Sequence, residues 1–567
     1  MKYTGHIDSF ARDNLPPREQ WPELVFDLPE LRFPAQVNCG AALLDSVVAS
    51  GRGERIALRT REGQCTYLQL ACQANRIANV LVEDMGLEPG NRVLLPAPNG
   101  PMLTASLFAV WKAGGVAVPT MPLLRSRELA QVIRKARVTH ALCDRRLAVE
   151  LEGARATCPT LAQVKYFRDD APDSLEPVAS RKSHHFKNVA TAGDDVALIA
   201  FTSGTSGIPK GTMHFHRDML AVCECFPKSM LQHTGDDIVA GTPALAFTYG
   251  FSGLFLFPAR YGACAVLTEQ YTPETLLETV QRFGVTVIYS VPTFYRAMAP
   301  IASNYDLSSL RACVSAGEPL PVPTRNAWEQ ATGVKIIDGI GSSEMSFIYI
   351  SAAGDDIRPG ATGKPIPGYR AAVFDEAGDP APAGTVGRLA IKGPTGCRYL
   401  ADERQKSYVH NGWNFTGDAY LVDPDGYYFY QARVDDMIIS AGYNIAGPEV
   451  ESALLAHPAV AECGVVGWPD EERGQIVKAF VVLKLGYQRT DALAAELQDH
   501  VKRSIAPYKY PRAVEFMNAL PRTETGKLQR FKLRPPQTPL VPIGNAGTEE
   551  PRRPQGEPAQ TPRSGAR

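Results

Sequence analysis

The segment best suited to chemistry is Phe201-Thr-Ser-Gly-Thr-Ser-Gly-Ile-Pro-Lys-Gly-Thr212, in which hydroxyl side chains and glycines surround Lys210. Glycines let backbone N–H groups approach a phosphate closely, hydroxyls donate hydrogen bonds to its oxygens, and a lysine neutralises its charge. The segment is not a Walker A loop, because Pro209 stands where that pattern needs its second glycine. Its composition therefore predicts a phosphate-binding loop rather than a plain surface turn.

Five further segments follow along the chain: Ser315-Ala-Gly-Glu-Pro319, Asp338-Gly-Ile-Gly-Ser-Ser-Glu-Met345, Gly412-Trp-Asn-Phe-Thr-Gly-Asp418, Arg433-Val-Asp-Asp436 and Pro521-Arg-Thr-Glu-Thr-Gly-Lys527. Together with the first segment they resemble, in order, the motifs of the adenylate-forming enzymes, which include acyl- and aryl-CoA ligases. The resemblance covers about residues 10–534. It implies that a carboxylate attacks the α-phosphate of ATP, that pyrophosphate leaves, and that the thiol of CoA then displaces AMP.

The resemblance also assigns nucleotide-binding roles residue by residue. It places the ATP phosphates against Thr202, Ser203, Gly204, Thr205, Ser206, Gly207 and Lys210, and the adenine side against Gly317, Glu318, Asp338, Gly339 and Ile340. Asp418 would accept hydrogen bonds from both ribose hydroxyls, as one carboxylate can, and Arg433 would also reach the ribose. Gly442 would approach the pantetheine arm of CoA. Ile340 stands where the family often has an aromatic residue, so an apolar wall replaces ring stacking.

Three residues are implied as catalytic, namely Lys527, Glu344 and Ser343. Lys527 would lie near the carboxylate and the α-phosphate, the hydroxyl of Ser343 would face the α-phosphate, and Glu344 would help bind Mg²⁺. Negative charge builds in both steps, so catalysis would depend on positioning and on stabilisation of that charge. Asp435 is the implied hinge of a rotating small domain. Acetylation of Lys527 would remove its charge and act as an off switch.

The acyl pocket is expected along two segments and would be lined by Phe247, Thr248, Tyr249, Gly250, Gly341, Phe347 and Ile348. Aromatic side chains there would form a flat apolar slot for an aromatic ring, although ordinary core packing explains them equally well. Benzoate-CoA ligases usually carry His at the position of Phe347 and a small apolar residue at the position of Thr248. The Thr248 hydroxyl is therefore a candidate partner for an ortho substituent.

Three longer runs resemble the 2-aminobenzoate-CoA ligase group, namely residues 211–217, 440–450 and 506–512. The best-supported hypothesis is an aryl-acid CoA ligase that activates 2-aminobenzoate with ATP, CoA and Mg²⁺. Alternatives are a benzoate, hydroxybenzoate or medium-chain acyl-CoA ligase, a separate adenylation module that loads a carrier protein, and an inactive nucleotide-binding protein. Bulky Tyr249 and Phe347 argue against a long acyl chain.

The elements that would position these residues alternate between short apolar runs and helical patterns. Strands are expected at 91–97, 115–119, 196–200, 285–289, 460–467 and 476–485, and helices at 101–114, 276–283, 449–455 and 491–503. This predicts an α/β fold with parallel sheets covered by helices. The large N-terminal domain would consist of stacked α/β subdomains (1–431), followed by a small mobile α+β C-terminal domain (432–534). The proline-rich end (535–567) is expected to be a disordered tail.

Composition excludes several classes of function. The chain has 567 residues, and its 59 Lys+Arg against 60 Asp+Glu give a formal net charge of -1, which argues against a nucleic-acid partner. The apolar stretch 244–257 is too short for a membrane span, which needs ~20 residues. No secretory signal is evident, and the cysteines show neither disulfide nor zinc spacing, so a cytoplasmic monomer or small homo-oligomer is expected.

Overall fold

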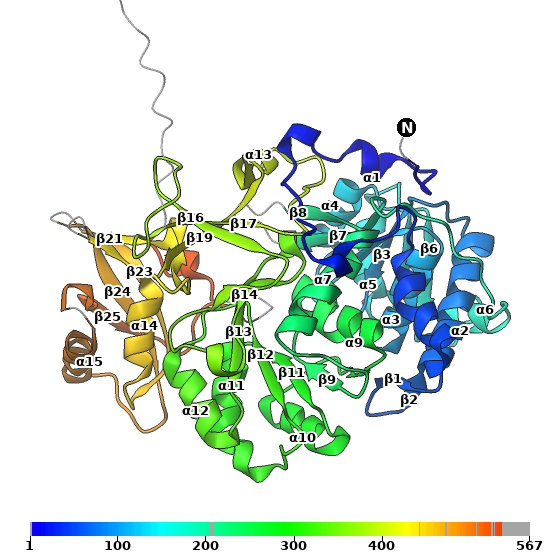
Figure 1. The fold of residues 1–567 in the computed structure, drawn as a ribbon. Helices are drawn as coiled ribbons and strands as arrows, with labels where there is room; N and C mark the ends of the chain where they lie inside the picture. Colours follow the sequence, from blue (N-terminus) through cyan, green and yellow to red (C-terminus); the bar gives the residue numbers. More distant parts are fainter. Residues whose placement is uncertain are drawn as a thin grey trace, which may run out of the picture.

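The computed structural model describes residues 3–202, 209–440, 443–470, 473–505, 507–522, 526 and 528–535. The large N-terminal domain contains two main sheets, and the small C-terminal domain lies to one side of it (Figure 1). The α/β architecture expected from the sequence is therefore confirmed. The predicted tail lies outside the described residues except for Pro535.

The first sheet has six strands in the order β6-β5-β3-β4-β7-β8. They are β3 (Arg92–Pro96), β4 (Val116–Thr120), β5 (His140–Asp144), β6 (Gln163–Phe167), β7 (Val196–Thr202) and β8 (Lys210–Phe215). Its helices are α2 (Tyr67–Asn79), α3 (Pro101–Lys112), α4 (Ser126–Ala136), α5 (Ala148–Arg155) and α6 (Leu175–Ser180). Alternate residues of β3 face opposite sides, so Val93 packs in the core with α2 and α3, and Leu94 packs in the core with α4 and α5.

The second sheet has nine strands in the order β15-β14-β13-β12-β11-β9-β10-β1-β2. They are β1 (Ile56–Arg59), β2 (Gln64–Thr66), β9 (Ile238–Gly241), β10 (Cys264–Val266), β11 (Val287–Ser290), β12 (Ala312–Ser315), β13 (Ile336–Gly341), β14 (Ile348–Ser351) and β15 (Lys364–Pro365). Helices α10 (Pro273–Phe283), α11 (Pro292–Met298) and α12 (Val322–Thr332) cover one face. Helices α7 (His216–Ser229), α8 (Thr248–Phe251) and α9 (Phe257–Tyr261) lie on the other face. That face shares one apolar core with the first sheet, so the two sheets are stacked across a helical layer.

The expectation of parallel sheets holds in the interior of both sheets and is wrong at their edges. β8 is antiparallel to β7, and β2, β14 and β15 are antiparallel to their neighbours. The connections β1–β2, β7–β8 and β13–β14 are too short for the crossover that parallel pairing needs.

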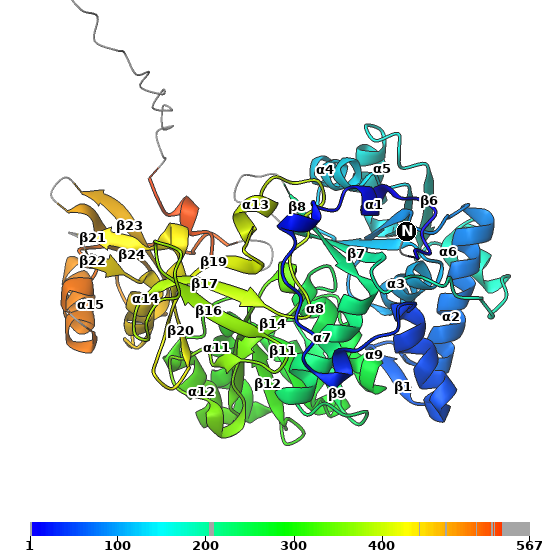
Figure 2. The same ribbon diagram turned by 45° about the horizontal axis from the view of Figure 1, so that its top comes forward.

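A third sheet, whose strands are not among those predicted, lies between the two domains. It is antiparallel and consists of β16 (Arg370–Phe374), β17 (Gly387–Lys392), β18 (Val409–His410), β19 (Trp413–Val422) and β20 (Tyr428–Arg433), with the short helix α13 (Gln405–Tyr408) beside it. In Figure 2 this sheet lies between the nine-stranded sheet and the C-terminal elements.

The C-terminal domain is the expected α+β unit. Strands β23 (Val460–Asp470), β24 (Gly474–Leu483) and β25 (Ala513–Phe516) form its main sheet, and β21 (Ile438–Ser440) pairs with β22 (Tyr443–Ile445). Helices α14 (Gly447–Leu455) and α15 (Asp491–Ser504) share its apolar core. The predicted strands and helices are thus present, with ends shifted by a few residues. Among the helices of the described residues, none has the length and apolar character to cross a membrane.

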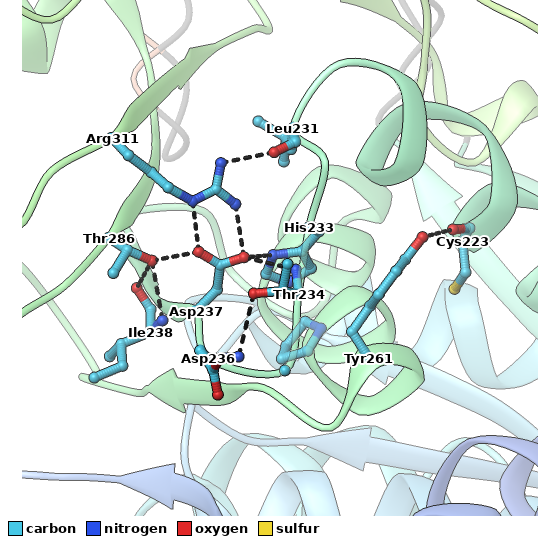
Figure 3. A network of polar contacts seen from close by, with 12 residues as sticks. Cys223, Leu231, His233, Thr234, Asp236, Asp237, Ile238, Tyr261, Thr286 and Arg311 are labelled. Carbon is cyan, nitrogen blue, oxygen red and sulfur yellow. Dashed lines mark hydrogen bonds and ion pairs between the residues drawn. The ribbon is translucent and has the colours of Figure 1, made fainter.

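A buried polar network holds the amino ends of three neighbouring strands of the nine-stranded sheet (Figure 3). The Asp237 carboxylate, just before β9, accepts hydrogen bonds from Arg311 (2.6 and 2.7 Å), before β12, and from Thr286 (2.7 Å), before β11. His233 Nδ1 lies 2.6 Å from the same carboxylate. Although burial opposes ionisation, the bonds from His233 and Arg311 hold the pKa of Asp237 well below its usual range. The opposite ends of these strands carry the candidate site.

Candidate active site

The predicted phosphate loop is the connection of the β7–β8 hairpin. Thr202 ends β7, and Lys210 begins β8 directly opposite it. The hairpin therefore fixes both ends of the loop, while Ser203, Gly204, Thr205, Ser206 and Gly207 lie outside the described residues.

Lys210 is linked to Glu344 through a tyrosine. Lys210 Nζ donates to Tyr399 Oη at 3.4 Å, and Tyr399 Oη donates to Glu344 Oε1 at 2.5 Å. Burial raises the pKa of Tyr399, and the neighbouring Glu344 carboxylate adds to the effect, so the phenol stays a proton donor. The structure thus brings together two residues that are far apart in the sequence, and Tyr399 was missed because no motif or spacing marks it.

Glu344 and Ser343 lie on a short 3-10 turn that follows β13. Residue 341 at the end of β13 must be glycine, because a Cβ there would lie 2.5 Å from the carbonyl oxygen of Phe347. After the turn, Ser346 adopts a left-handed conformation, and its Oγ lies 2.8 Å from Nδ1 of the buried His214 on β8. Burial lowers the pKa of His214 to about 4, so the imidazole is neutral near pH 7. The hairpin and the Glu344 turn are therefore joined a second time.

The residues predicted for the adenine side lie on or just after the adjacent strands β12 and β13. Gly317 and Glu318 lie in the loop after β12, where Gly317 has φ +91°, a conformation that favours glycine. Asp338, Gly339 and Ile340 lie on β13 itself, and Ile340 packs against the core as the expected apolar wall. Polar groups at the carboxyl ends of parallel strands are typical of α/β ligand sites.

The predicted ribose residues lie opposite each other on the third sheet. Asp418 on β19 pairs with Arg433 on β20, whose Nη1 donates to Asp418 Oδ1 at 2.9 Å and to the Thr416 carbonyl oxygen at 3.1 Å. Burial raises the pKa of Asp418, although Arg433 opposes the shift, and the negative charge of Glu344 adds to it. The Glu344 carboxylate is therefore close enough to influence the ionisation of Asp418.

The expected acyl-pocket residues form part of an aromatic cluster. Phe347 is only 3% exposed, and its ring centroid lies 5.6 Å from that of Tyr249, 5.0 Å from Phe226 and 4.8 Å from Phe257. The other residues predicted for the pocket lie on the neighbouring elements: Phe247, Thr248 and Gly250 at α8, and Gly341 and Ile348 at β13 and β14. Tyr249 Oη donates to the carbonyl oxygens of Ser290 and Val314, so this hydroxyl is bound to the protein backbone.

Three predicted residues remain, namely Lys527, Gly442 and Asp435. Lys527 and Gly442 lie outside the described residues. Asp435 lies on a 3-10 turn, Val434–Asp436, between β20 and β21, where the third sheet leads into the C-terminal domain. This position suits a hinge, and the hinge role stays a prediction.

Two family models match the chain. One, described as AMP-binding enzyme, matches residues 46–399, and the other, described as AMP-binding enzyme C-terminal domain, matches residues 449–527. The chain belongs to the AMP-binding enzyme family. Benzoate–CoA ligase of Thauera aromatica is 37% identical over 512 residues, which cover 89% of this chain and 97% of that ligase.

Solved structures of this family share the fold. The anthranilate CoA ligase AuaEII, solved in complex with anthranoyl-AMP, has a TM-score of 0.84 and 34% identity, with 88% of this chain and 97% of that chain covered. A benzoate CoA ligase from Burkholderia xenovorans LB400 has a TM-score of 0.80 and 32% identity, with 88% and 100% covered. The resemblance inferred from six short motifs is thus confirmed over most of the chain.

One predicted nucleotide residue of this AMP-binding enzyme has an unusual ionisation. Burial raises the pKa of Asp338 to about 7, and its Oδ1 has no hydrogen-bond partner in the described part of the chain. The folded protein therefore keeps a proton that the unfolded chain loses above pH ~4. This raised pKa gives a stability that is present at acid pH and is lost as the pH rises through 7.

We expect Asp338→Asn to flatten this pH dependence. Between pH 5 and 8.5, ionisation of the buried carboxyl costs roughly 2–3 kcal/mol in the unmodified protein, and the amide avoids that cost. Thermal unfolding midpoints measured across this range report the difference between the two proteins. The exposed Asp355→Asn serves as the control, and equal pH profiles for Asp338→Asn and the unmodified protein would contradict the raised pKa.

Proposed function

We propose that this protein is an AMP-forming aryl-acid CoA ligase. The observation that carries the proposal is the polar chain Lys210–Tyr399–Glu344, with the Asp418–Arg433 pair electrostatically coupled to Glu344. This arrangement combines a cation for phosphates, a carboxylate for a metal and a carboxylate for ribose hydroxyls. The similarity to benzoate and anthranilate CoA ligases supports the aryl-acid class.

The proposed reaction has two steps. A carboxylate oxygen of the acid bonds to the α-phosphorus of ATP while the bond to pyrophosphate breaks. The CoA thiolate then bonds to the acyl carbon, and the bond to AMP breaks. Lys210 binds and neutralises phosphate oxygens, Asp418 and Arg433 orient the ribose, and Ser343 and Lys527 contact the reacting end, so the protein acts by positioning and charge stabilisation.

Glu344 is the residue that would hold Mg²⁺. Its carboxylate accepts from Tyr399 through Oε1, and carboxylate oxygens are ligands that Mg²⁺ prefers. No group of three or more His, Cys, Asp or Glu side chains suited to a metal occurs among the described residues. When bound, Mg²⁺ supplies charge neutralisation at the phosphate oxygens.

We propose 2-aminobenzoate as the preferred acid. Thr248 opens α8 beside the aromatic cluster, is 7% exposed, and makes no hydrogen bond through its hydroxyl to the described residues. The hydroxyl is thus available to the ortho amino group of a ring that lies against the cluster. The similarity to the anthranilate CoA ligase AuaEII, whose acid is 2-aminobenzoate, supports the same choice.

The test is AMP release with ATP, Mg²⁺ and CoA across benzoate, 2-aminobenzoate, 2-hydroxybenzoate, 4-hydroxybenzoate and octanoate, each with a control without CoA. We expect CoA-dependent AMP release that is fastest with 2-aminobenzoate. Preference for another aryl acid would retain the mechanism and reject the substrate. Pyrophosphate exchange without turnover of CoA would indicate a module that loads a carrier protein.

Thr248→Val is expected to lower the preference for 2-aminobenzoate over benzoate by about tenfold, because one hydrogen bond to the amino group is lost. The measurement is the ratio of kcat/KM for the two acids. Thr248→Ser keeps the hydroxyl and should keep most of the preference. An unchanged ratio in Thr248→Val would reject this contact.

A further inference from the structure

The turn that carries Glu344 is bound to the β7–β8 hairpin by one side chain of its own, that of Ser346. Ser346 Oγ lies 2.8 Å from Nδ1 of His214, near the end of β8. The two residues are buried, with exposed fractions of 1% and 0%. Water therefore competes little for this contact, and its loss would leave polar atoms in the interior without their partner.

Two other elements hold the same turn, but they bind its backbone. Ser252 Oγ, just after α8, donates to the carbonyl oxygen of Ser346 at 3.1 Å. Thr395 Oγ1, after β17, donates to the carbonyl oxygen of Met345 at 2.8 Å. These contacts do not depend on which side chains positions 345 and 346 carry. The contact with His214 does depend on residue 346, because it needs a hydroxyl there.

The place of His214 on β8 connects it to the predicted phosphate ligand. Lys210 and His214 stand four residues apart on this strand, so their side chains leave it on the same face. Lys210 reaches Glu344 through Tyr399, where the ends of three side chains meet. His214 reaches the base of the same turn. The cation and the carboxylate are thus joined both at their tips and at the elements that carry them.

The backbone of Ser346 would suit a different residue. Its φ of +68° lies in the left-handed region, which glycine adopts more readily than any residue with a Cβ. Serine at this position is therefore the poorer choice for the backbone, and it supplies the hydroxyl that His214 binds. The two requirements can be separated by substitution at this one position.

We propose that His214 and Ser346 are positioning residues that set the separation between Lys210 and the Glu344 carboxylate. They touch no reacting atom in this assignment and act by holding the Glu344 turn against β8. The inference rests on the proposed function, because the step that it concerns is formation of the acyl-adenylate.

His214→Leu is expected to slow single-turnover formation of the acyl-AMP by about tenfold, because loss of a buried hydrogen bond lets the Glu344 turn leave its productive position. Asparagine has nearly the shape of leucine and places an amide atom where Nδ1 stands, so His214→Asn should stay within about threefold of the unmodified enzyme. Affinity for ATP without Mg²⁺ should change by less than about twofold in both variants. Equal slowing by leucine and asparagine would overturn the proposal.

Substitutions at Ser346 test the same contact from its other side. Ser346→Ala and Ser346→Gly both lack the hydroxyl, and only glycine suits the left-handed backbone, so both should be about tenfold slower. Adding His214→Leu to Ser346→Ala should cost less than about twofold more. Ser46→Ala, whose exposed hydroxyl binds within its own helix, is the control. Normal activity of Ser346→Gly, or full additivity of the pair, would overturn the proposal.

Hydrogen exchange separates failure of this inference from failure of the proposed function, because it needs no substrate. The amides of Met345 and Ser346 donate within the turn at 3.2 and 3.3 Å. In His214→Leu, residues 343–348 should exchange faster than in the unmodified protein, and in His214→Asn they should not. Unchanged exchange in His214→Leu would overturn the contact. Faster exchange, in a protein that adenylates none of the acids, would support the contact and reject the ligase.

Discussion

Glu344→Gln should lower the rate of acyl-adenylate formation by about 10²–10³-fold and leave the fold intact. Glutamine keeps the shape of the side chain and still accepts the hydrogen bond from Tyr399, but it lacks the negative charge proposed to bind Mg²⁺. The expected signature is a weakened response to Mg²⁺ in single-turnover assays. Thermal midpoints should stay close to that of the unmodified protein.

Two companion variants sharpen this result. Tyr399→Phe keeps both charges and removes only the hydroxyl that joins them, so we expect a smaller loss of about tenfold. Glu403→Gln, at an exposed carboxylate that pairs with Lys406, should have no effect. Activity of Glu344→Gln within threefold of the unmodified enzyme would remove Glu344 from the proposed metal site.

Asp418→Asn should weaken ATP binding by about a hundredfold. The carboxylate is proposed to accept hydrogen bonds from both ribose hydroxyls, and the amide would also leave Arg433 without its charged partner. Titration calorimetry with ATP, 2′-deoxy-ATP and 3′-deoxy-ATP would test the assignment. The unmodified protein should discriminate against both deoxy analogues, and Asp418→Asn should not.

The raised pKa of Asp418 adds a pH dependence to this prediction. Because burial favours the protonated carboxyl, the acceptor is lost at a higher pH than for an ordinary aspartate, so ATP binding should weaken as the pH falls. Asp425→Asn, at an exposed carboxylate after β19, serves as the control. Retained discrimination against deoxy analogues in Asp418→Asn would reject the ribose contact.

The buried interior of the fold was predictable because periodic apolar runs mark it. Elements such as α3 and β4 are apolar along most of their length, and Pro101 at the first turn marks where α3 begins. The third sheet carries no comparable signal. Its strands are short or mix charged and aromatic residues, and β16 to β20 pair through contacts that only the folded chain provides.

Some residues of the candidate site were predictable from the sequence, and others were not. Lys210, Glu344, Asp418 and Arg433 were recognised from motifs, and the structure pairs the last two and links the first two through Tyr399. Tyr399 itself was missed, because its role depends on two partners that are remote in sequence. For Phe347, the sequence left pocket and core equally open, and its packing against other aromatic rings makes it part of the core as well.

The network around Asp237 has a consequence for how such an enzyme can diversify. It joins β9, β11 and β12 at their amino ends, away from the loops that carry the candidate site. The alignment of these strands at that end therefore does not depend on which residues those loops carry. Substitutions near Thr248 or Phe347, in the proposed acid pocket, are then expected to leave the alignment of these three strands unchanged. The anchored amino ends therefore favour evolvability. Residues at the carboxyl ends of these strands can change during selection for new acids, because the alignment of the strands is fixed at their amino ends.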